Sequence, residues 1–209
     1  WIDTYYNLGN KVIRRLQLED SIFEWLTVIF LILASTFLLK IFLNVRKKKI
    51  SNLKKYFFLV LSISFLFWAL EEISWGQRIF DFSWTYISQN NSQNEINFHN
   101  LNIIQPSLHK LYILYCSFVS LLCLLKKKEN NLLLPEKKLF YFFLLPGLYY
   151  LVGELILNFP ISYQGVKYTY TVLSGNVFVF QEVNECLLAL GNFLYAFNIF
   201  RKIENLKNL

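Results

Sequence analysis

Five apolar segments dominate the sequence, and each is long enough to cross a lipid bilayer. They cover approximately residues 22–45, 56–75, 108–125, 139–159 and 177–200. A helix needs about 20 mostly apolar residues to span the hydrocarbon core. Backbone polar groups in that core must be satisfied within the protein, and a helix satisfies its own. The sequence therefore predicts an all-α integral membrane protein with about five transmembrane helices, in a single membrane domain that covers residues 1–209.

The composition agrees with several membrane spans, since 55% of the residues are hydrophobic and 19% are aromatic. The net charge of +7 comes from short basic clusters between the apolar segments. Clusters of this kind indicate topology and do not form a continuous surface for phosphate groups. We therefore expect the lipid bilayer as the surroundings of this protein, and no nucleic-acid partner.

The distribution of charge predicts an orientation. Fourteen of the 21 Lys and Arg residues lie in residues 46–55, 126–138 and 201–207, which alternate with the spans. Cytoplasmic loops carry an excess of Lys and Arg. Eleven of the 14 carboxylates fall on the other side of the membrane. We expect a bacterial inner (plasma) membrane, with the N-terminus outside and the C-terminus in the cytoplasm.

Three segments outside the spans have distinct patterns. Residues 1–20 alternate apolar and basic positions, which is typical of an interfacial helix. The chain does not begin with Met and contains none, which is compatible with a missing initiator, signal peptide or earlier span. Residues 77–106 interleave amides with apolar side chains, which predicts a polar cap over the outer helix ends. Residues 160–176 have a hairpin-like pattern. Ser21 and Glu24 predict a capping box at the start of the first span.

The most crowded polar stretch is E-E-I-S-W-G-Q-R at residues 71–78. Charge in hydrocarbon is costly and is usually functional. If the helix continued through Gly76, Glu71 and Arg78 would share one face, which allows an ion pair that locks the helix to its neighbours. Alternatively, Glu71 or Glu72 is a base or a metal ligand, and Arg78 binds an anionic group of a substrate.

Glu182 and Glu185 are three residues apart and therefore share a helix face near the outer end of the fifth span. Two carboxylates on one face repel unless a proton, a cation or an Arg separates them. Glu154 lies at a comparable depth in the fourth span. We expect an acidic cluster in the outer part of the bundle, formed by Glu71 or Glu72, Glu154, Glu182 and Glu185. The alternative is that Glu182 and Glu185 are surface acids.

Glu95 and His99 are four residues apart. On a helix this spacing allows both side chains to bind one metal ion, or allows a structural hydrogen bond of the histidine. The chain has only two histidines, which excludes a three-His site and a di-iron site with two Glu-x-x-His motifs. No Gly-x-Ser-x-Gly motif is present, and the three cysteines fall inside spans. A divalent ion is the cofactor expected for the candidate ligands, which are Glu95, His99, Glu154, Glu182 and Glu185.

The combination of E-E-I-S-W-G-Q-R with N-E-I-N-F-H-N at residues 94–100 resembles segments of a family of uncharacterised multi-pass bacterial membrane proteins. The likeness covers approximately residues 71–101, with a weaker similarity at 181–185. The resemblance implies that these residues form a site, and it implies no activity.

Three functions are compatible with these patterns. The first is a membrane enzyme that acts on a lipid-linked or amphiphilic substrate, with His99 as proton carrier and Arg78 as anion clamp. The second is a non-catalytic subunit of a larger membrane complex, in which the same polar groups make contacts between helices. The third, proton or cation transport, is weaker because the inner halves of the spans have few polar groups. The candidate catalytic residues are Glu71, Glu72, Arg78, His99, Glu182 and Glu185.

Overall fold

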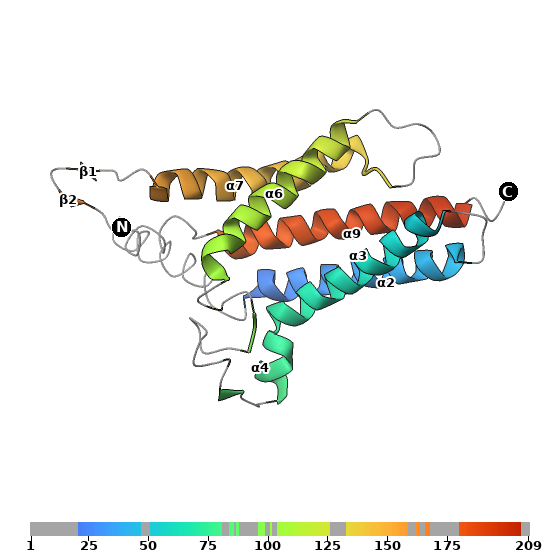
Figure 1. The fold of residues 1–209 in the computed structure, drawn as a ribbon, viewed down its shortest axis with the longest axis horizontal. Helices are drawn as coiled ribbons and strands as arrows, with labels where there is room; N and C mark the ends of the chain where they lie inside the picture. Colours follow the sequence, from blue (N-terminus) through green and yellow to red (C-terminus); the bar gives the residue numbers. More distant parts are fainter. Residues whose placement is uncertain are drawn as a thin grey trace, which may run out of the picture.

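The computed structural model describes residues 21–46, 51–80, 84–85, 87, 96–98, 101, 104–125, 133–158, 162–163, 166–167 and 180–205. Five long helices form most of this part: α2 (Ile22–Val45), α3 (Asn52–Glu72), α6 (Gln105–Leu124), α7 (Phe140–Asn158) and α9 (Gln181–Asn205) (Figure 1). Each is long and apolar enough to span a membrane. The predicted all-α fold with five spans is confirmed, and it indicates an integral membrane protein.

Short elements connect or extend these helices. They are η1 (Ser74–Gly76), α4 (Gln77–Phe80), η2 (Lys137–Leu139), β1 (Ser162–Tyr163) and β2 (Val166–Lys167). The two strands are antiparallel, with Ser162 opposite Lys167, which confirms the hairpin expected within residues 160–176. Ser21 is the N-cap of α2, as expected, and its hydroxyl accepts a hydrogen bond from the backbone N–H of Glu24. The interfacial helix predicted for residues 1–20 lies outside the described residues.

The helices pack in the order α3, α2, α9, α7, α6. Figure 1 shows α9 between α2 and α7. One end of the bundle holds the first residues of α2, α6 and α9 and the last residues of α3 and α7 (Figure 1). We call it the carboxylate end because Glu72, Glu182 and Glu185 lie there. The other end holds η2 and the end of α9.

Two serines join α2 to α3 within the membrane-spanning part. The Ser35 hydroxyl donates to the backbone carbonyl of Ser62 at 2.8 Å, and the Ser62 hydroxyl donates to the carbonyl of Ser35 at the same distance. Such hydrogen bonds hold helices together in lipid, where there is little hydrophobic difference between the interface and the surroundings.

Two glycines allow close approach around α7. A Cβ atom at Gly147 would lie 2.8 Å from Cys116 Cβ on α6, and one at Gly191 of α9 would lie 2.8 Å from Phe142 Cβ. Small residues at such contacts let helix backbones approach closely. The positions of α6 and α9 relative to α7 therefore depend on these two glycines.

Replacing Gly191 by Ala is expected to lower the free energy of unfolding by about 1–3 kcal/mol, because α9 and α7 must move apart to accept the methyl group. Denaturant unfolding of the purified protein in detergent micelles measures the change. Leu148→Ala is the control, since Leu148 lies on α7, the helix that faces Gly191, and its side chain is 43% exposed. An equal effect of the two substitutions would contradict the close packing at Gly191.

The opposite end of the bundle contains an ion pair network. Glu136 accepts hydrogen bonds from Lys138 of η2, at 2.8 Å, and from Lys202 of α9. Partial burial raises the pKa of Glu136, but the hydrogen bonds and charges of the two lysines outweigh it and lower the pKa to about 2. The network links the start of α7 to the end of α9.

The stabilising effect of Glu136 should therefore depend on pH. Because its folded-state pKa is lowered, its contribution is fully present above the usual carboxyl pKa and is lost as the pH falls towards 2. We expect Glu136→Gln to melt at a lower temperature than the wild type at pH 7, with the difference shrinking below about pH 4.5. Thermal unfolding over that pH range tests this, and a difference that is independent of pH would contradict it.

Candidate functional site

Helix α3 ends earlier than the sequence suggested. Its last residue is Glu72, and the next turn has left-handed backbone at Ser74 (φ 47°), Trp75 (φ 57°) and Gly76 (φ 84°). The helix does not continue through Gly76, so the expected stripe that joins Glu71 to Arg78 is not formed. The backbone of Arg78 lies in α4, and its side chain lies outside the described part of the structure.

Residues 97 and 98 of the 77–106 segment contact the end of α3 and the turn that follows it. Glu71 accepts hydrogen bonds from the Trp75 indole and, at 2.7 Å, from the backbone N–H of Phe98. The Asn97 amide donates to the Ser74 hydroxyl at 3.2 Å, and Asn97 is buried. Residues 96–98 therefore fold over the end of α3, which agrees with the cap predicted here. Glu71 has a structural role in holding them.

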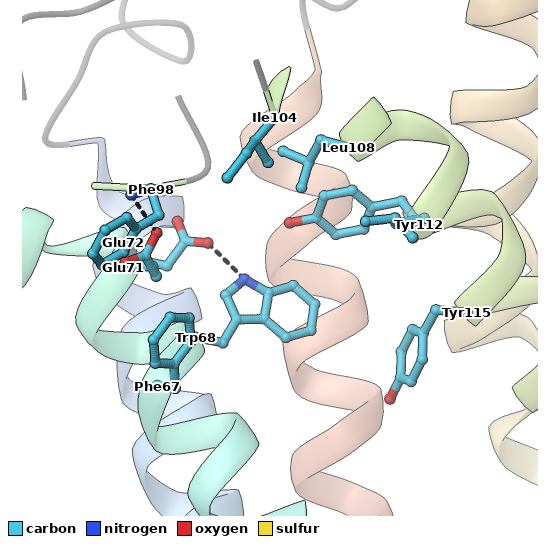
Figure 2. Close-up of a pocket in the computed structure, with 10 residues that line it drawn as sticks. Phe67, Trp68, Glu71, Glu72, Phe98, Ile104, Leu108, Tyr112 and Tyr115 are labelled. Carbon is cyan, nitrogen blue, oxygen red and sulfur yellow. Dashed lines mark hydrogen bonds between the residues drawn. The ribbon is translucent and has the colours of Figure 1, made fainter. Parts of the chain in front are cut away.

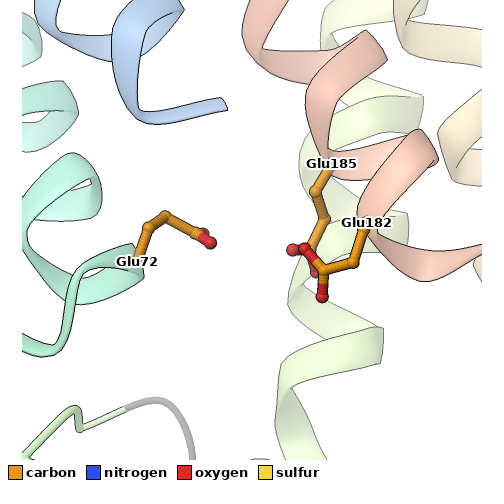
Figure 3. Close-up of side chains that lie close together, drawn as sticks. All are labelled: Glu72, Glu182 and Glu185. Carbon is orange, nitrogen blue, oxygen red and sulfur yellow. The ribbon is translucent and has the colours of Figure 1, made fainter. Parts of the chain in front are cut away.

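Glu72 points towards Glu182 and Glu185 of α9 (Figure 3). One carboxylate oxygen each of Glu72, Glu182 and Glu185 lies within 4.8 Å of the other two. Glu72 and Glu185 are buried, and Glu182 is half-buried. The expected shared face of Glu182 and Glu185 is thus turned towards α3, and Glu72 is the member of the Glu71–Glu72 pair that meets it. We call these three residues the carboxylate group.

Aromatic and amide donors orient the carboxylate group. The Trp68 indole donates to Glu72 at 2.8 Å, one turn away on α3. The Tyr150 hydroxyl of α7 donates to Glu185 at 2.7 Å, and the Gln181 amide donates to the same oxygen at 3.1 Å. These neutral donors fix the positions of the carboxylate oxygens without adding charge. Partners of this kind determine how a carboxylate directs its lone pairs towards a bound group.

Three carboxylates at this separation repel one another when all are ionised. They are stable together when they share a proton, bind a cation or meet a basic side chain. Oxygen ligands from two helices suit a hard divalent ion. A carboxylate in this setting can also transfer protons to or from a bound molecule. Both kinds of chemistry require access from outside the bundle.

Glu154 was expected to join this cluster, but the structure places it beside His109 of α6. Its carboxylate lies 2.7 Å from His109 Nδ1. The His109 ring contacts the Tyr150 ring at a centroid distance of 5.2 Å, and Tyr150 stacks on Tyr112 at 4.8 Å. The contacts of His109 and Tyr150 therefore connect Glu154 to Glu185 of the carboxylate group. Its expected role as a metal ligand together with Glu182 and Glu185 has no support in this geometry.

The proposed pair of Glu95 and His99 lies outside the described residues, so its role as a metal or proton site remains a prediction. Sequence reasoning missed four residues of the site, namely Trp68, His109, Tyr112 and Tyr150. The spacing of four residues between Trp68 and Glu72 is the one local signal that could have indicated a contact. The contact of Tyr150 with Glu185 joins residues from different helices and has no local signal.

A cavity of about 410 Å³ lies between α3 and α6 at the carboxylate end (Figure 2). Its volume is within the range of small-molecule sites. Glu71 and Glu72 are its two charged lining residues, and Figure 2 shows Glu72 beside the Trp68 indole at the same end of the cavity. The other lining residues are apolar or aromatic: Phe67, Trp68, Phe98, Ile104, Leu108, Leu111, Tyr112 and Tyr115.

No protein-family model, curated protein or solved structure matches this chain. The similarity at residues 71–101 therefore brings no activity with it. The cavity and the carboxylate group are the structural features that indicate a function.

Proposed function

We propose that this protein is a membrane enzyme that acts on an amphiphilic substrate at its carboxylate end. The observation that carries the proposal is that Glu72 belongs both to the cavity lining and to the carboxylate group. A molecule in the cavity would reach Glu72, and through it the two carboxylates of α9. Ionisable groups within membrane-spanning segments are usually functional because their burial is costly.

In this proposal Glu72 is the acid or base that meets the substrate. Trp68 holds one of its oxygens at 2.8 Å, which directs the carboxylate between the cavity and α9. Glu182 and Glu185 accept or return the proton, and Tyr150 positions Glu185. A divalent ion bound by the three carboxylates would instead polarise a substrate oxygen. The apolar lining excludes water from the reacting groups, which strengthens the electrostatic interactions there.

Lipid analysis tests this function. The purified protein is reconstituted in vesicles of a total bacterial lipid extract, with added Mg²⁺, Mn²⁺ or Zn²⁺ or with a chelator, and the lipids are followed by mass spectrometry. A change that requires the wild-type protein supports an enzyme. No change under any of these conditions, together with recovery of the protein only in a complex with other membrane proteins, would favour the non-catalytic subunit.

For the orientation we propose that the carboxylate end faces the outside of a bacterial inner membrane and that the C-terminus is cytoplasmic. The support is that 14 of the 21 basic residues lie in segments on the other side of the membrane from the carboxylate end. Cytoplasmic segments carry an excess of Lys and Arg. We expect Lys127→Cys to react with a membrane-impermeant thiol reagent only from the cytoplasmic side, and Asn91→Cys only from outside. Labelling of intact cells and of inverted vesicles measures this, and the reverse pattern would invert the proposed topology.

A further inference from the structure

We infer that the cavity between α3 and α6 binds the hydrocarbon chain of the substrate, and that the head group of this substrate donates hydrogen bonds and carries no negative charge. A long-chain amine or a long-chain alcohol has this chemistry. The inference rests on the proposed function and specifies its substrate class.

The position of the cavity suits a hydrocarbon chain. Helix α3 packs on α2 and α6 packs on α7, so α3 and α6 are the two outer helices of the bundle. Across the space between them, the Trp68 ring contacts the rings of Tyr112 and Tyr115, at centroid distances of 5.6 and 6.5 Å. The contact between the two helices is therefore made by side chains, and the cavity lies within it.

The lining continues onto the surface that faces lipid. Phe67 of α3 is 48% exposed and Leu111 of α6 is 56% exposed, and both line the cavity. In a bilayer this surface contacts acyl chains. A hydrocarbon chain can therefore enter sideways from the membrane, without passing through water and without leaving an apolar environment.

The charged end of the cavity determines the head group. Glu71 already accepts hydrogen bonds on both oxygens, from Trp75 and Phe98. Glu72 accepts one from Trp68 on Oε1, and no described residue donates to its Oε2. This oxygen is the acceptor that remains for a bound head group. A hydroxyl or an ammonium group can donate to it, because each carries hydrogen-bond donors.

An anionic head group is disfavoured at the same place. A phosphate or a carboxylate in the cavity would lie beside Glu71 and Glu72, with Glu182 and Glu185 behind them. Like charges brought together at a desolvated site repel each other strongly. Charge complementarity therefore selects neutral or cationic amphiphiles.

Photolabelling tests this inference. The protein in lipid nanodiscs is exposed to diazirine analogues of a fatty amine, a fatty alcohol and a fatty acid of equal chain length, and labelled peptides are identified by mass spectrometry. We expect the amine and alcohol probes to label residues 67–72 and 104–115 at least about tenfold more than the acid probe. Equal or stronger labelling by the acid would overturn the assignment of the head group.

A matched pair of variants tests the cavity. Leu108→Trp places a large ring in the lining and should reduce labelling of these peptides about tenfold. Leu114→Trp is the control, because Leu114 is on the same helix, is 67% exposed and does not line the cavity. Labelling that is unchanged by Leu108→Trp, or reduced equally by both substitutions, would overturn the cavity as the binding site.

Glu72→Gln separates the two kinds of head group. With its oxygen on the Trp68 donor, the Gln side chain has an NH2 group where Glu72 has Oε2. This group can donate to a hydroxyl oxygen but not to an ammonium group, which has no acceptor, so labelling by the amine should fall about tenfold while labelling by the alcohol is kept. An unchanged ratio of the two would overturn the role of Glu72 in recognition. Labelling needs no turnover, so a specific label without any lipid conversion would reject the enzyme and leave the binding site in place.

Discussion

Glu72→Gln is expected to lower turnover of the amphiphilic substrate by about 100-fold or more, which is the usual contribution of a positioned acid or base. Glu72 is the one described residue that both lines the cavity and belongs to the carboxylate group. Glutamine keeps the size of the side chain and can still accept the Trp68 hydrogen bond. The bundle should therefore remain folded, and the loss should come from the chemical step and, for an amine substrate, also from weaker binding.

The measurement is the rate of lipid conversion by mass spectrometry, with unfolding in detergent as the check on stability. Glu204→Gln is the control, since Glu204 is an exposed glutamate at the other end of α9. Wild-type turnover in the Glu72 variant would remove this carboxylate from the mechanism. A loss of turnover accompanied by unfolding would assign Glu72 to the structure of the bundle, as expected for the subunit function.

The spans were predictable because hydropathy is a local property of the chain. The first helix, Ile22–Val45, has the expected bounds. The second was expected to continue to residue 75 and ends at Glu72. The cause is the left-handed backbone of Ser74 and Trp75, which neither side chain favours by itself. At this turn Ser74 contacts Asn97 and Glu71 contacts Phe98, which are more than 20 residues away in the sequence. No local sequence pattern predicts these contacts.

The carboxylate site was predictable only in part, for a similar reason. Helical periodicity places Glu182 and Glu185 on one face. It leaves open whether Glu71 or Glu72 meets them, because that depends on how α3 lies beside α2 and α9. Periodicity also leaves open the partner of Glu154. His109 lies beside Glu154 because α6 packs on α7, and periodicity does not predict how two helices pack. Distances between helices depend on side-chain packing over the whole bundle, which one sequence does not display.

Tyr150 offers the sharpest test of how the carboxylate group is positioned. Its side chain is fully buried, its ring contacts those of Tyr112 and His109, and its hydroxyl donates to Glu185 at 2.7 Å. Tyr150→Phe keeps the ring contacts and removes this donor. Because partners that orient a functional group usually contribute about 10–100-fold, we expect turnover to fall by that factor.

The neighbouring Tyr149 is the matched control for this prediction. Its hydroxyl accepts a hydrogen bond from the backbone N–H of Phe180 at 3.0 Å. Tyr149→Phe removes a hydroxyl from the next residue of α7 without removing a donor to Glu185, so turnover should stay within about threefold of wild type. Lipid conversion and unfolding are measured for both variants. If Tyr150→Phe retained full turnover, or if both variants lost it equally, the hydroxyl of Tyr150 would not position Glu185 for catalysis. A selective loss in Tyr150→Phe at unchanged stability would connect α7 to the chemistry of the α3 and α9 carboxylates.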